Sequence, residues 1–268
     1  MQTPQKIDAI ASSATSIAGI AAGHLDLTWR KLMCRQGAFA DEHCFRLMSG
    51  EPHPLGNLAI FSHGASRQVT ERGVSPLLEL EVPTAALFTS EPGDEVVQAL
   101  SALGFMKAED MPAMAVDIDG IAPTSLPAGY AMTRIDAGPV ASDWTEVAAA
   151  GFELPRGLAM MLSPEVLGAD MAVDADTQFF GIWNQGRLVA TSMMFLAGGV
   201  AGIYCVATLP EERGRGLGAH ATAEPLRVAR GLGYGVGVLQ SSESGHRVYR
   251  RLGFIDVGTL PLFVRMPA

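Results

Sequence analysis

The stretch Pro210-Glu-Glu-Arg-Gly-Arg-Gly-Leu-Gly218 decides how this chain is interpreted. Its three glycines within five residues let the backbone turn tightly with no Cβ in the way, so that successive N–H groups can converge on one point. A run rich in β-formers precedes the stretch and an apolar, helix-like run follows it. The N-terminal end of a helix adds unpaired amides and a positive partial charge. The pattern therefore predicts a loop that binds a phosphate or diphosphate.

The glycine spacing separates this loop from two other phosphate-binding loops. It is neither the G-x-x-x-x-G-K-[ST] of nucleoside triphosphatases nor the G-x-G-x-x-G of dinucleotide-binding folds. It fits R-x-x-G-x-G, with Arg213, Gly216 and Gly218 at the fixed positions. Arg213 and Arg215 are expected to bring positive charge to the outer phosphates. A basic surface turn leading into a helix would have the same composition, so the surrounding sequence has to decide.

The segments around the loop alternate between strand-like and helix-like patterns. Asn184-Gln185-Gly186 is typical of a β-hairpin turn, with Gly186 at the positive φ that such a turn requires. Hydrophobic periodicity predicts the other elements. The predicted strands are 130–135, 178–183, 187–196, 199–207, 235–240 and 260–266, and the predicted helices are 140–152, 217–230 and one ending near Leu252. This succession predicts an α/β fold with a mixed sheet.

A second motif, Tyr249-Arg-Arg-Leu-Gly-Phe254, begins 31 residues after Gly218. Residues 206–218 resemble motif A of the GCN5-related N-acetyltransferase (GNAT) superfamily, and this second motif resembles its motif B, Y-x-x-x-G-F. The resemblance covers about half of the chain, from Tyr130 onward. It implies the GNAT acyl-CoA N-acyltransferase fold, whose sheet would splay between the strands ending near Val206 and Ser241. Acetyl-CoA, the implied cofactor, would bind in that opening.

The resemblance also assigns roles to individual residues. Tyr249 would be the general acid toward the coenzyme sulfur, since a tyrosine with an ordinary pKa of about 10 is protonated at neutral pH. The backbone N–H of Val206 would stabilise the carbonyl oxygen of the acetyl group. Cys205 and Ala207 would flank the pantetheine arm and pair with its amides. The cofactor-binding residues expected on this basis are Cys205, Val206, Ala207, Arg213, Gly214, Arg215, Gly216, Leu217, Gly218, Ala219, Ser242 and Tyr249.

Cys205, Ser242 and Pro225 each affect what is expected of this region. Cys205 has no base beside it in the sequence, and we expect a small buried apolar residue rather than a nucleophile. Many relatives carry asparagine where this chain has Ser242, and a hydroxyl replaces only part of an amide's hydrogen bonding. Pro225 falls inside the predicted helix 217–230, where it removes a backbone donor and is expected to kink the helix.

The sequence gives weaker signals for the residues that would bind the acceptor amine. Glu153, at the end of the helix 140–152, and Trp29 are the candidate substrate-binding residues, although an exposed helix-end carboxylate is the alternative for Glu153. His220 and His246 could deprotonate an amine by their pKa, but surface or capping positions are expected, and a water chain could serve instead. His43, Cys44, His53 and His63 lack zinc-like spacing, so we expect no metal.

The first part of the chain repeats a short pattern of the second. Leu103-Gly104-Phe105 and Leu252-Gly253-Phe254 lie 149 residues apart, and each is followed by a proline. The alternative is two unrelated helices that each stop at a glycine. A duplication predicts a degenerate GNAT-like domain over 1–119, a linker over 120–128 and a catalytic domain over 129–268. Leu100 would then stand in the place of Tyr249, and this half should bind no coenzyme.

Composition limits the partners and the compartment. The chain has 268 residues, 48% of them hydrophobic, and a net charge of -9, which argues against nucleic acid or an anionic membrane as a partner. Three cysteines without a C-x-x-C pair fit a reducing compartment, and we expect a cytoplasmic protein. Residues 7–25 are expected to form a helix rather than a signal peptide. A homodimer is compatible with the sequence.

These observations predict an N-acetyltransferase that moves an acetyl group from acetyl-CoA to an amine of a small molecule or peptide. Two alternatives stay open. One is a coenzyme A-binding sensor without turnover, which the serine at position 242 and the unidentified base motivate. The other keeps the fold but uses a longer acyl-CoA or an aminoacyl-tRNA as donor, and the acidic balance argues against tRNA.

Overall fold

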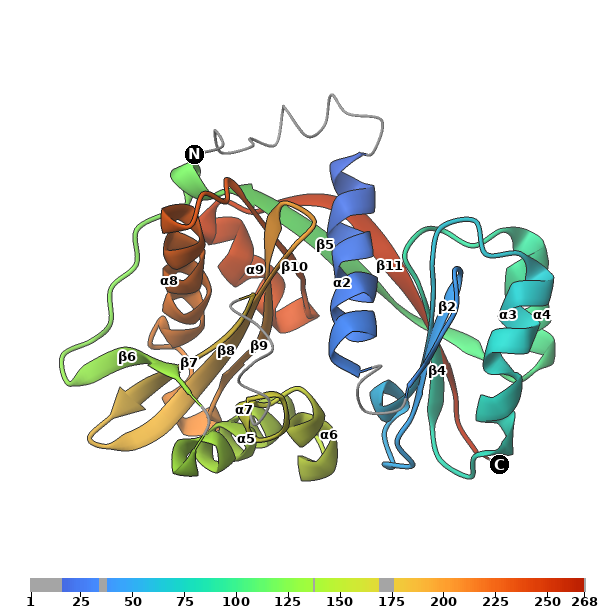
Figure 1. Cartoon of the computed structure of the whole chain (residues 1–268), viewed down its shortest axis with the longest axis horizontal. Helices are drawn as coiled ribbons and strands as arrows, with labels where there is room; N and C mark the ends of the chain where they lie inside the picture. Colours follow the sequence, from blue (N-terminus) through green and yellow to red (C-terminus); the bar gives the residue numbers. More distant parts are fainter. Residues whose placement is uncertain (1–15, 34–37, 137, 169–175, 268) are drawn as a thin grey trace. The chain divides into compact units, whose positions relative to one another are not determined.

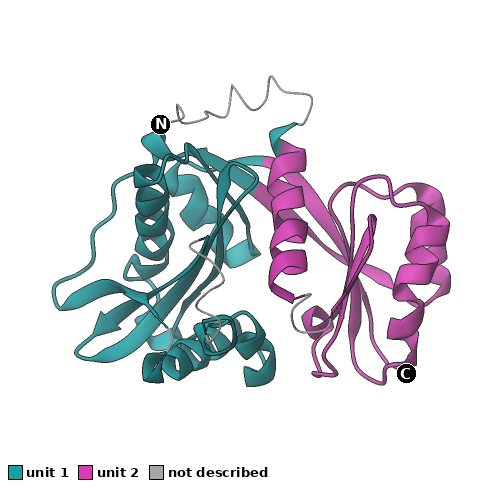
Figure 2. Ribbon diagram, viewed as in Figure 1, with its two compact units in different colours: residues 1–17, 114–256 teal, residues 18–113, 257–268 magenta. Residues whose placement is uncertain are grey.

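The computed structural model describes residues 16–33, 38–136, 138–168 and 176–267. The chain divides into two compact units, shown in different colours in Figure 2. Unit 1 consists mainly of residues 114–256, and unit 2 consists of residues 18–113 and 257–268.

Unit 1 contains a mixed sheet with helices on both faces (Figure 1). Its elements are β6 (Tyr130–Ile135), α5 (Pro139–Phe152), α6 (Arg156–Met161), α7 (Pro164–Leu167), β7 (Thr177–Asn184), β8 (Arg187–Ala197), β9 (Val200–Thr208), η5 (Pro210–Glu212), α8 (Leu217–Gly231), β10 (Val236–Gln240) and α9 (Glu243–Leu252). The strand order is β5-β10-β9-β8-β7-β6, where β5 is Met106–Asp117. Strands β6 to β9 form an antiparallel meander, and β10 joins β9 in parallel. The predicted α/β fold is confirmed.

The local sequence explains the hairpin of β7 and β8. Gln185 and Gly186, which connect the two strands, have φ of 50° and 80°. Two consecutive positive φ values match the right-handed twist of the flanking strands, as in a type I′ turn. The hairpin predicted from Asn184-Gln185-Gly186 is therefore confirmed.

Two helices cover opposite faces of the unit 1 sheet. Trp144 of α5 is fully buried, lies edge-on to Phe179 of β7 at 5.4 Å between ring centroids, and donates Nε1–H to the carbonyl of Phe180 at 3.0 Å. The side chain of Phe180 belongs instead to the cluster that contains Leu226 of α8. Because neighbouring strand residues point to opposite faces, α5 and α8 lie on different sides of β7 and β8.

Unit 2 has a smaller mixed sheet. Its elements are α2 (Ile17–Met33), β1 (Phe39–Ala40), β2 (Cys44–Met48), η2 (Pro54–Gly56), β3 (Asn57–Phe61), α3 (Arg67–Val74), η3 (Ser75–Glu79), β4 (Thr84–Phe88) and α4 (Asp94–Ala102). Its strand order is β1-β2-β3-β4-β11, where β11 is Ile255–Arg265. β3 and β4 are parallel, whereas the other pairs are antiparallel. Stacked Phe61 and Phe88, with Phe263 edge-on to Phe88, centre its core. The predicted helix 7–25 is observed from Ile17; residues before 16, and Cys34, lie outside the described residues.

Two strands pass from one unit to the other. β5 begins in unit 2 and ends in unit 1 beside β10, whereas β11 (Ile255–Arg265) begins in unit 1 and ends in unit 2 beside β4. β11 starts at Ile255 rather than at the predicted Leu260. β5 thus completes the sheet of unit 1, and β11 completes the sheet of unit 2. For this reason the boundaries of the compact units differ from the predicted limits 1–119 and 129–268. Those domain limits stay a prediction.

The two L-G-F triplets have the same local structure. Gly104 has φ of 84° two residues after the end of α4, and Gly253 has φ of 104° directly after α9. Each glycine is followed by a phenylalanine that is 1% exposed and by a long strand. The order of elements from β2 to β5 also repeats the order from β8 to β11: two antiparallel strands, a helix, a parallel strand, a helix and a last strand.

Candidate functional site

The sheet of unit 1 opens between β9 and β10. The parallel ladder joins Ala201 to Gly237 and Gly202 to Val238, and it goes no further among the described residues. Beyond that point β9 runs on to Thr208 and β10 to Gln240. The two strands therefore diverge toward their C-terminal ends, which is the opening predicted between Val206 and Ser241.

A β-bulge lies in β9 at this opening. The register with β8 passes from Met193↔Tyr204 to Thr191↔Ala207, so β9 has one residue more than β8 across the interval. Cys205 adopts φ of 52°, and its carbonyl accepts a hydrogen bond from Thr191 Oγ1 at 3.0 Å. The bulge takes Cys205 and Val206 out of the ladder with β8, which re-aims their backbone groups.

The predicted phosphate loop leads from β9 into α8. Gly214 and Gly216 both have φ of 79°, and a Cβ at either position would meet no atom within 4 Å. These positions therefore need glycine for its backbone conformation and not for space. The first amides of α8 have no intrahelical acceptor because of their position. Left-handed glycines followed by a helix N-terminus form the kind of loop that suits an anion, so the residues fit the diphosphate of coenzyme A.

The two arginines of the loop are held by protein oxygens. Arg213 donates from Nη2 to the carbonyl of Gly151 at 2.9 Å and from Nε to the carbonyl of Thr208 at 3.4 Å. Arg215 Nε lies 3.2 Å from a carboxylate oxygen of Glu212. The geometry therefore supports the backbone amides of the loop, more directly than the arginines, as the anion-binding groups. The phosphate contacts of Arg213 and Arg215 stay predictions.

The C-terminal end of α5 approaches β9 closely. A Cβ at Gly151 would lie 2.8 Å from the Ala207 Cβ and 3.1 Å from the Thr208 nitrogen, so only glycine fits there. Glu153 follows as the cap of α5, exposed and at φ of 58°. Glu153 therefore lies two residues after Gly151, which contacts the bulged strand β9 directly. Trp29 is half-buried on α2 of unit 2, where it packs on Phe45. The acceptor roles of Glu153 and Trp29 stay predictions.

Tyr249 lies on α9 and packs on the same core cluster as Val206 and Ala219. Burial raises the pKa of Tyr249 to about 12, so its hydroxyl stays protonated at neutral pH. A Cβ at Gly245 would lie 2.9 Å from the Tyr249 ring, so that glycine, one turn earlier, leaves room for it. Burial also raises the pKa of Cys205 to about 12, which agrees with the apolar role predicted for this cysteine.

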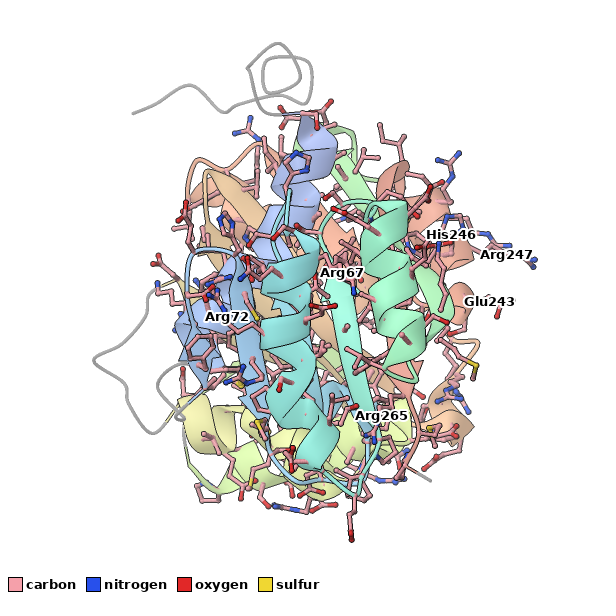
Figure 3. All side chains as sticks on the ribbon, turned by 90° about the vertical axis from the view of Figure 1, so that its right-hand side faces the viewer. Arg67, Arg72, Glu243, His246, Arg247 and Arg265 are labelled. Carbon is pink, nitrogen blue, oxygen red and sulfur yellow. The ribbon has the colours of Figure 1, made fainter. Side chains whose placement is uncertain are left out.

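Other predicted residues of this region have structural partners. Ser242 caps α9 by accepting a hydrogen bond from the Gly245 N–H at 3.2 Å. His220 Nδ1 lies 3.0 Å from Thr124 Oγ1, and burial lowers the pKa of His220. His246 Nε2 lies 2.7 Å from Asp256 Oδ1, and Figure 3 shows His246 beside Arg247 and Glu243 at the surface. Pro225 lies within α8, which is unbroken from Leu217 to Gly231.

Sequence reasoning missed Glu212. The predicted motif begins at Arg213, and the residue before it shows no pattern that would single it out. In the structure its side chain is 11% exposed and contacts Tyr130, Asn184 and Arg215. Only the fold brings these four residues together.

Within residues 16–33, 38–136, 138–168 and 176–267, no group of three or more His, Cys, Asp or Glu side chains is arranged to hold a metal ion. Over the same part of the chain, no helix has the length and apolar character needed to cross a bilayer.

Unit 2 lacks the opening at the equivalent strands. The parallel ladder of β3 and β4 continues to Phe61↔Phe88, and Thr89 N–H donates to the Phe61 carbonyl at 3.0 Å. The β2–β3 register runs without a shift from Cys44 to Met48. Leu100, which aligns with Tyr249, is fully buried in the unit 2 core. The place where a coenzyme would enter is therefore closed by strand pairing.

Comparison with known proteins agrees with this geometry. Residues 144–254 match the model of the acetyltransferase (GNAT) family. No curated protein sequence matches the chain. A GCN5-related N-acetyltransferase from Kribbella flavida is similar in structure, with a TM-score of 0.66, 20% identity and coverage of 94% of this chain and 96% of that chain. One from Sphaerobacter thermophilus has a TM-score of 0.61, 16% identity and coverage of 91% and 84%.

A third similar structure is a tandem GNAT protein from the clavulanic acid biosynthesis pathway, with a TM-score of 0.54, 14% identity and coverage of 84% of this chain and 79% of that chain. Identities this low show the fold alone. The family match adds the sequence evidence over the segment that contains the bulge, the glycine loop and Tyr249. Residues 144–254 therefore form a domain of the acetyltransferase (GNAT) family, and the chain shares its fold with GCN5-related N-acetyltransferases of solved structure.

Proposed function

We propose that this protein is an acetyl-CoA-dependent N-acetyltransferase that moves the acetyl group directly to a primary amine of a small molecule or a peptide N-terminus. The observation that carries the proposal is the bulge at Cys205–Val206, which lies where β9 separates from β10 and just before the glycine loop. An unpaired strand edge can pair with an extended chain of amides, as in pantetheine, and the loop suits a diphosphate. Acetyl-CoA would supply the activated thioester.

The residues of the site would divide the chemistry among them. The Val206 N–H would donate a hydrogen bond to the acetyl oxygen, which gains negative charge as the amine nitrogen forms its bond to the carbonyl carbon. As the carbon–sulfur bond breaks, the protonated hydroxyl of Tyr249 would donate to the departing sulfur. The amine loses its proton to solvent or a base. Burial raises the pKa of the Cys205 thiol to about 12, so the thiol is not the reactive thiolate at neutral pH. This favours direct transfer over an acyl-cysteine intermediate.

For the acceptor we propose an amine-bearing molecule that is cationic before it reacts. A net charge of -9 favours such a molecule, and Glu153 places an exposed carboxylate near the bulged strand. Unit 2 would be a degenerate copy of the same fold that binds no coenzyme, because its parallel ladder is closed at Phe61↔Phe88.

The test is thiol release from acetyl-CoA with a panel of amines, using wild type and Tyr249→Phe. We expect the variant to lose at least about a hundredfold in turnover, since general acid catalysis contributes at least that much. Its affinity for free coenzyme A, measured by calorimetry, should be unchanged. Tyr234→Phe is the matched control, because Tyr234 packs on the same core cluster. Equal turnover in wild type and Tyr249→Phe would remove Tyr249 from the mechanism.

A sensor without turnover is the second candidate. Ser242, which stands where many relatives carry asparagine, caps α9 with its hydroxyl. Thermal stabilisation by acetyl-CoA with no thiol release for any amine would support the sensor against the enzyme. Stronger stabilisation by longer acyl-CoAs than by acetyl-CoA would show a different acyl donor.

A further inference from the structure

Glu212 is a largely buried carboxylate directly before the glycine loop. Its side chain is 11% exposed. One carboxylate oxygen accepts a hydrogen bond from the Tyr130 hydroxyl at 2.6 Å and lies 3.2 Å from Arg215 Nε, and the other accepts from Asn184 Nδ2 at 3.4 Å. A buried carboxylate is tolerated when donors surround it in this way.

The donors come from two different places. Tyr130 begins β6 and Asn184 ends β7, and the two residues are paired in the antiparallel register. Arg215 belongs to the loop itself. Glu212 therefore ties the start of the loop to a hydrogen-bonded sheet edge. On the other side, Arg213 ties the loop to the Gly151 carbonyl at the end of α5.

A loop with glycines at 214 and 216 needs such an anchor. Glycine has the largest backbone entropy to lose on ordering, so a glycine loop presents converging amides only where other contacts hold it. The charge of Glu212 has the opposite effect, since a carboxylate near a diphosphate repels it. The carboxylate would keep Tyr130 and Asn184 as donors if Arg215 turned toward a phosphate.

We propose that Glu212 is the positioning residue of the coenzyme-binding loop, which it holds against the sheet edge formed by Tyr130 and Asn184 so that the loop amides face the diphosphate. This inference rests on the function proposed above. Anchoring and charge predict opposite signs for the loss of the carboxylate. Anchoring predicts weaker coenzyme binding, whereas repulsion alone predicts tighter binding.

The experiment is calorimetric titration of the full-length protein with free coenzyme A. For Glu212→Ala we expect the Kd to rise about tenfold or more, the range for a lost hydrogen-bonded charge. Glu212→Gln keeps an oxygen that can accept from Tyr130 and should fall between Glu212→Ala and wild type. Tyr130→Phe should weaken binding, and its effect should not add to that of Glu212→Ala, because both remove the same contact.

Two controls separate anchoring from charge and from lost stability. Glu211→Ala removes the same charge one residue away, where the side chain is 54% exposed and pairs with Arg187. Its Kd should stay within about twofold of wild type, since an exposed ion pair contributes little. Glu165→Ala removes a carboxylate that accepts from Thr145 and Arg156, away from the loop. It should lower Tm without weakening coenzyme binding.

Amide hydrogen exchange of residues 213–219 in the ligand-free protein gives a readout that does not depend on Glu212→Ala folding. It should be faster in Tyr130→Phe and Glu212→Gln than in wild type. Coenzyme binding by Glu212→Ala as tight as wild type or tighter, or unchanged exchange in the two milder variants, would overturn the inference. If wild type itself binds no coenzyme A, the proposed function fails first, and the anchoring role fails with it.

Discussion

Cys205 has a left-handed backbone conformation that costs a non-glycine residue of the order of 1–3 kcal/mol. The surrounding structure imposes this conformation. The register of β8 and β9 resumes on both sides of it, and the Thr191 hydroxyl donates to its carbonyl. The strain therefore marks the point where β9 leaves the ladder, beside the opening in which we place the thioester.

His24 carries a prediction about acid stability. It is 3% exposed in α2, and burial lowers its pKa from 6.5 to about 4. As the pH falls, the unfolded chain takes up the proton near 6.5 and the folded chain only near 4. The stability that uncharged, buried His24 contributes is therefore complete above pH 6.5. It is lost as the pH falls from 6.5 through 4. We expect a loss of up to about 3 kcal/mol across this window.

Urea denaturation of wild type and His24→Gln at a series of pH values from 7 to 4 measures this contribution. The carboxylates also titrate in this range, so the difference between the two proteins is the relevant quantity. His24→Gln should lose less unfolding free energy than wild type between these limits. Parallel curves for the two proteins would show that His24 does not contribute.

The close contact of α5 with β9 leads to a prediction about stability. Gly151→Ala would place a methyl group 2.8 Å from the Ala207 Cβ and 3.1 Å from a backbone nitrogen, which cannot move aside as a side chain can. We expect a cost of about 1–3 kcal/mol, the usual range for overpacking. Since the contact lies beside the bulge, coenzyme A affinity should fall as well.

Gly231→Ala is the control for this substitution. Gly231 ends α8, and a Cβ there would meet no atom within 4 Å. Replacing a helical glycine without strain should raise stability by up to about 1 kcal/mol. Thermal unfolding and coenzyme titration of both variants give the comparison. Equal stability of Gly151→Ala and wild type would mean that α5 can shift away from β9 without cost.

The arrangement of the whole chain leads to a prediction about fragments. Met114, Val116 and Ile118 lie upstream of the predicted linker, yet they are at most 3% exposed in the unit 1 core. A chain beginning at residue 129 lacks all three. Removing one large buried apolar side chain costs about 2–5 kcal/mol, so residues 129–268 should be several kcal/mol less stable than residues 114–268.

Urea denaturation of the two fragments tests this prediction. Both contain residues 257–268, so they differ only in residues 114–128. Equal midpoints would support the predicted domain limit at 129.

The sequence by itself determined the strands β6 to β10 and the helices α5, α8 and α9 of unit 1, the glycine loop and the position of Tyr249, whereas it gave no signal for α6 and α7. These features depend on local signals: hydrophobic periodicity, glycines that take positive φ, and two motifs at a set spacing. Only the tertiary structure decided the bulge at Cys205, the anchoring of the loop and the exchange of β5 and β11 between the units. These features come from contacts between distant residues, such as Tyr130 and Glu212, which are 82 positions apart. No local pattern specifies such a contact, because its energy exists only once the sheet has brought both residues together.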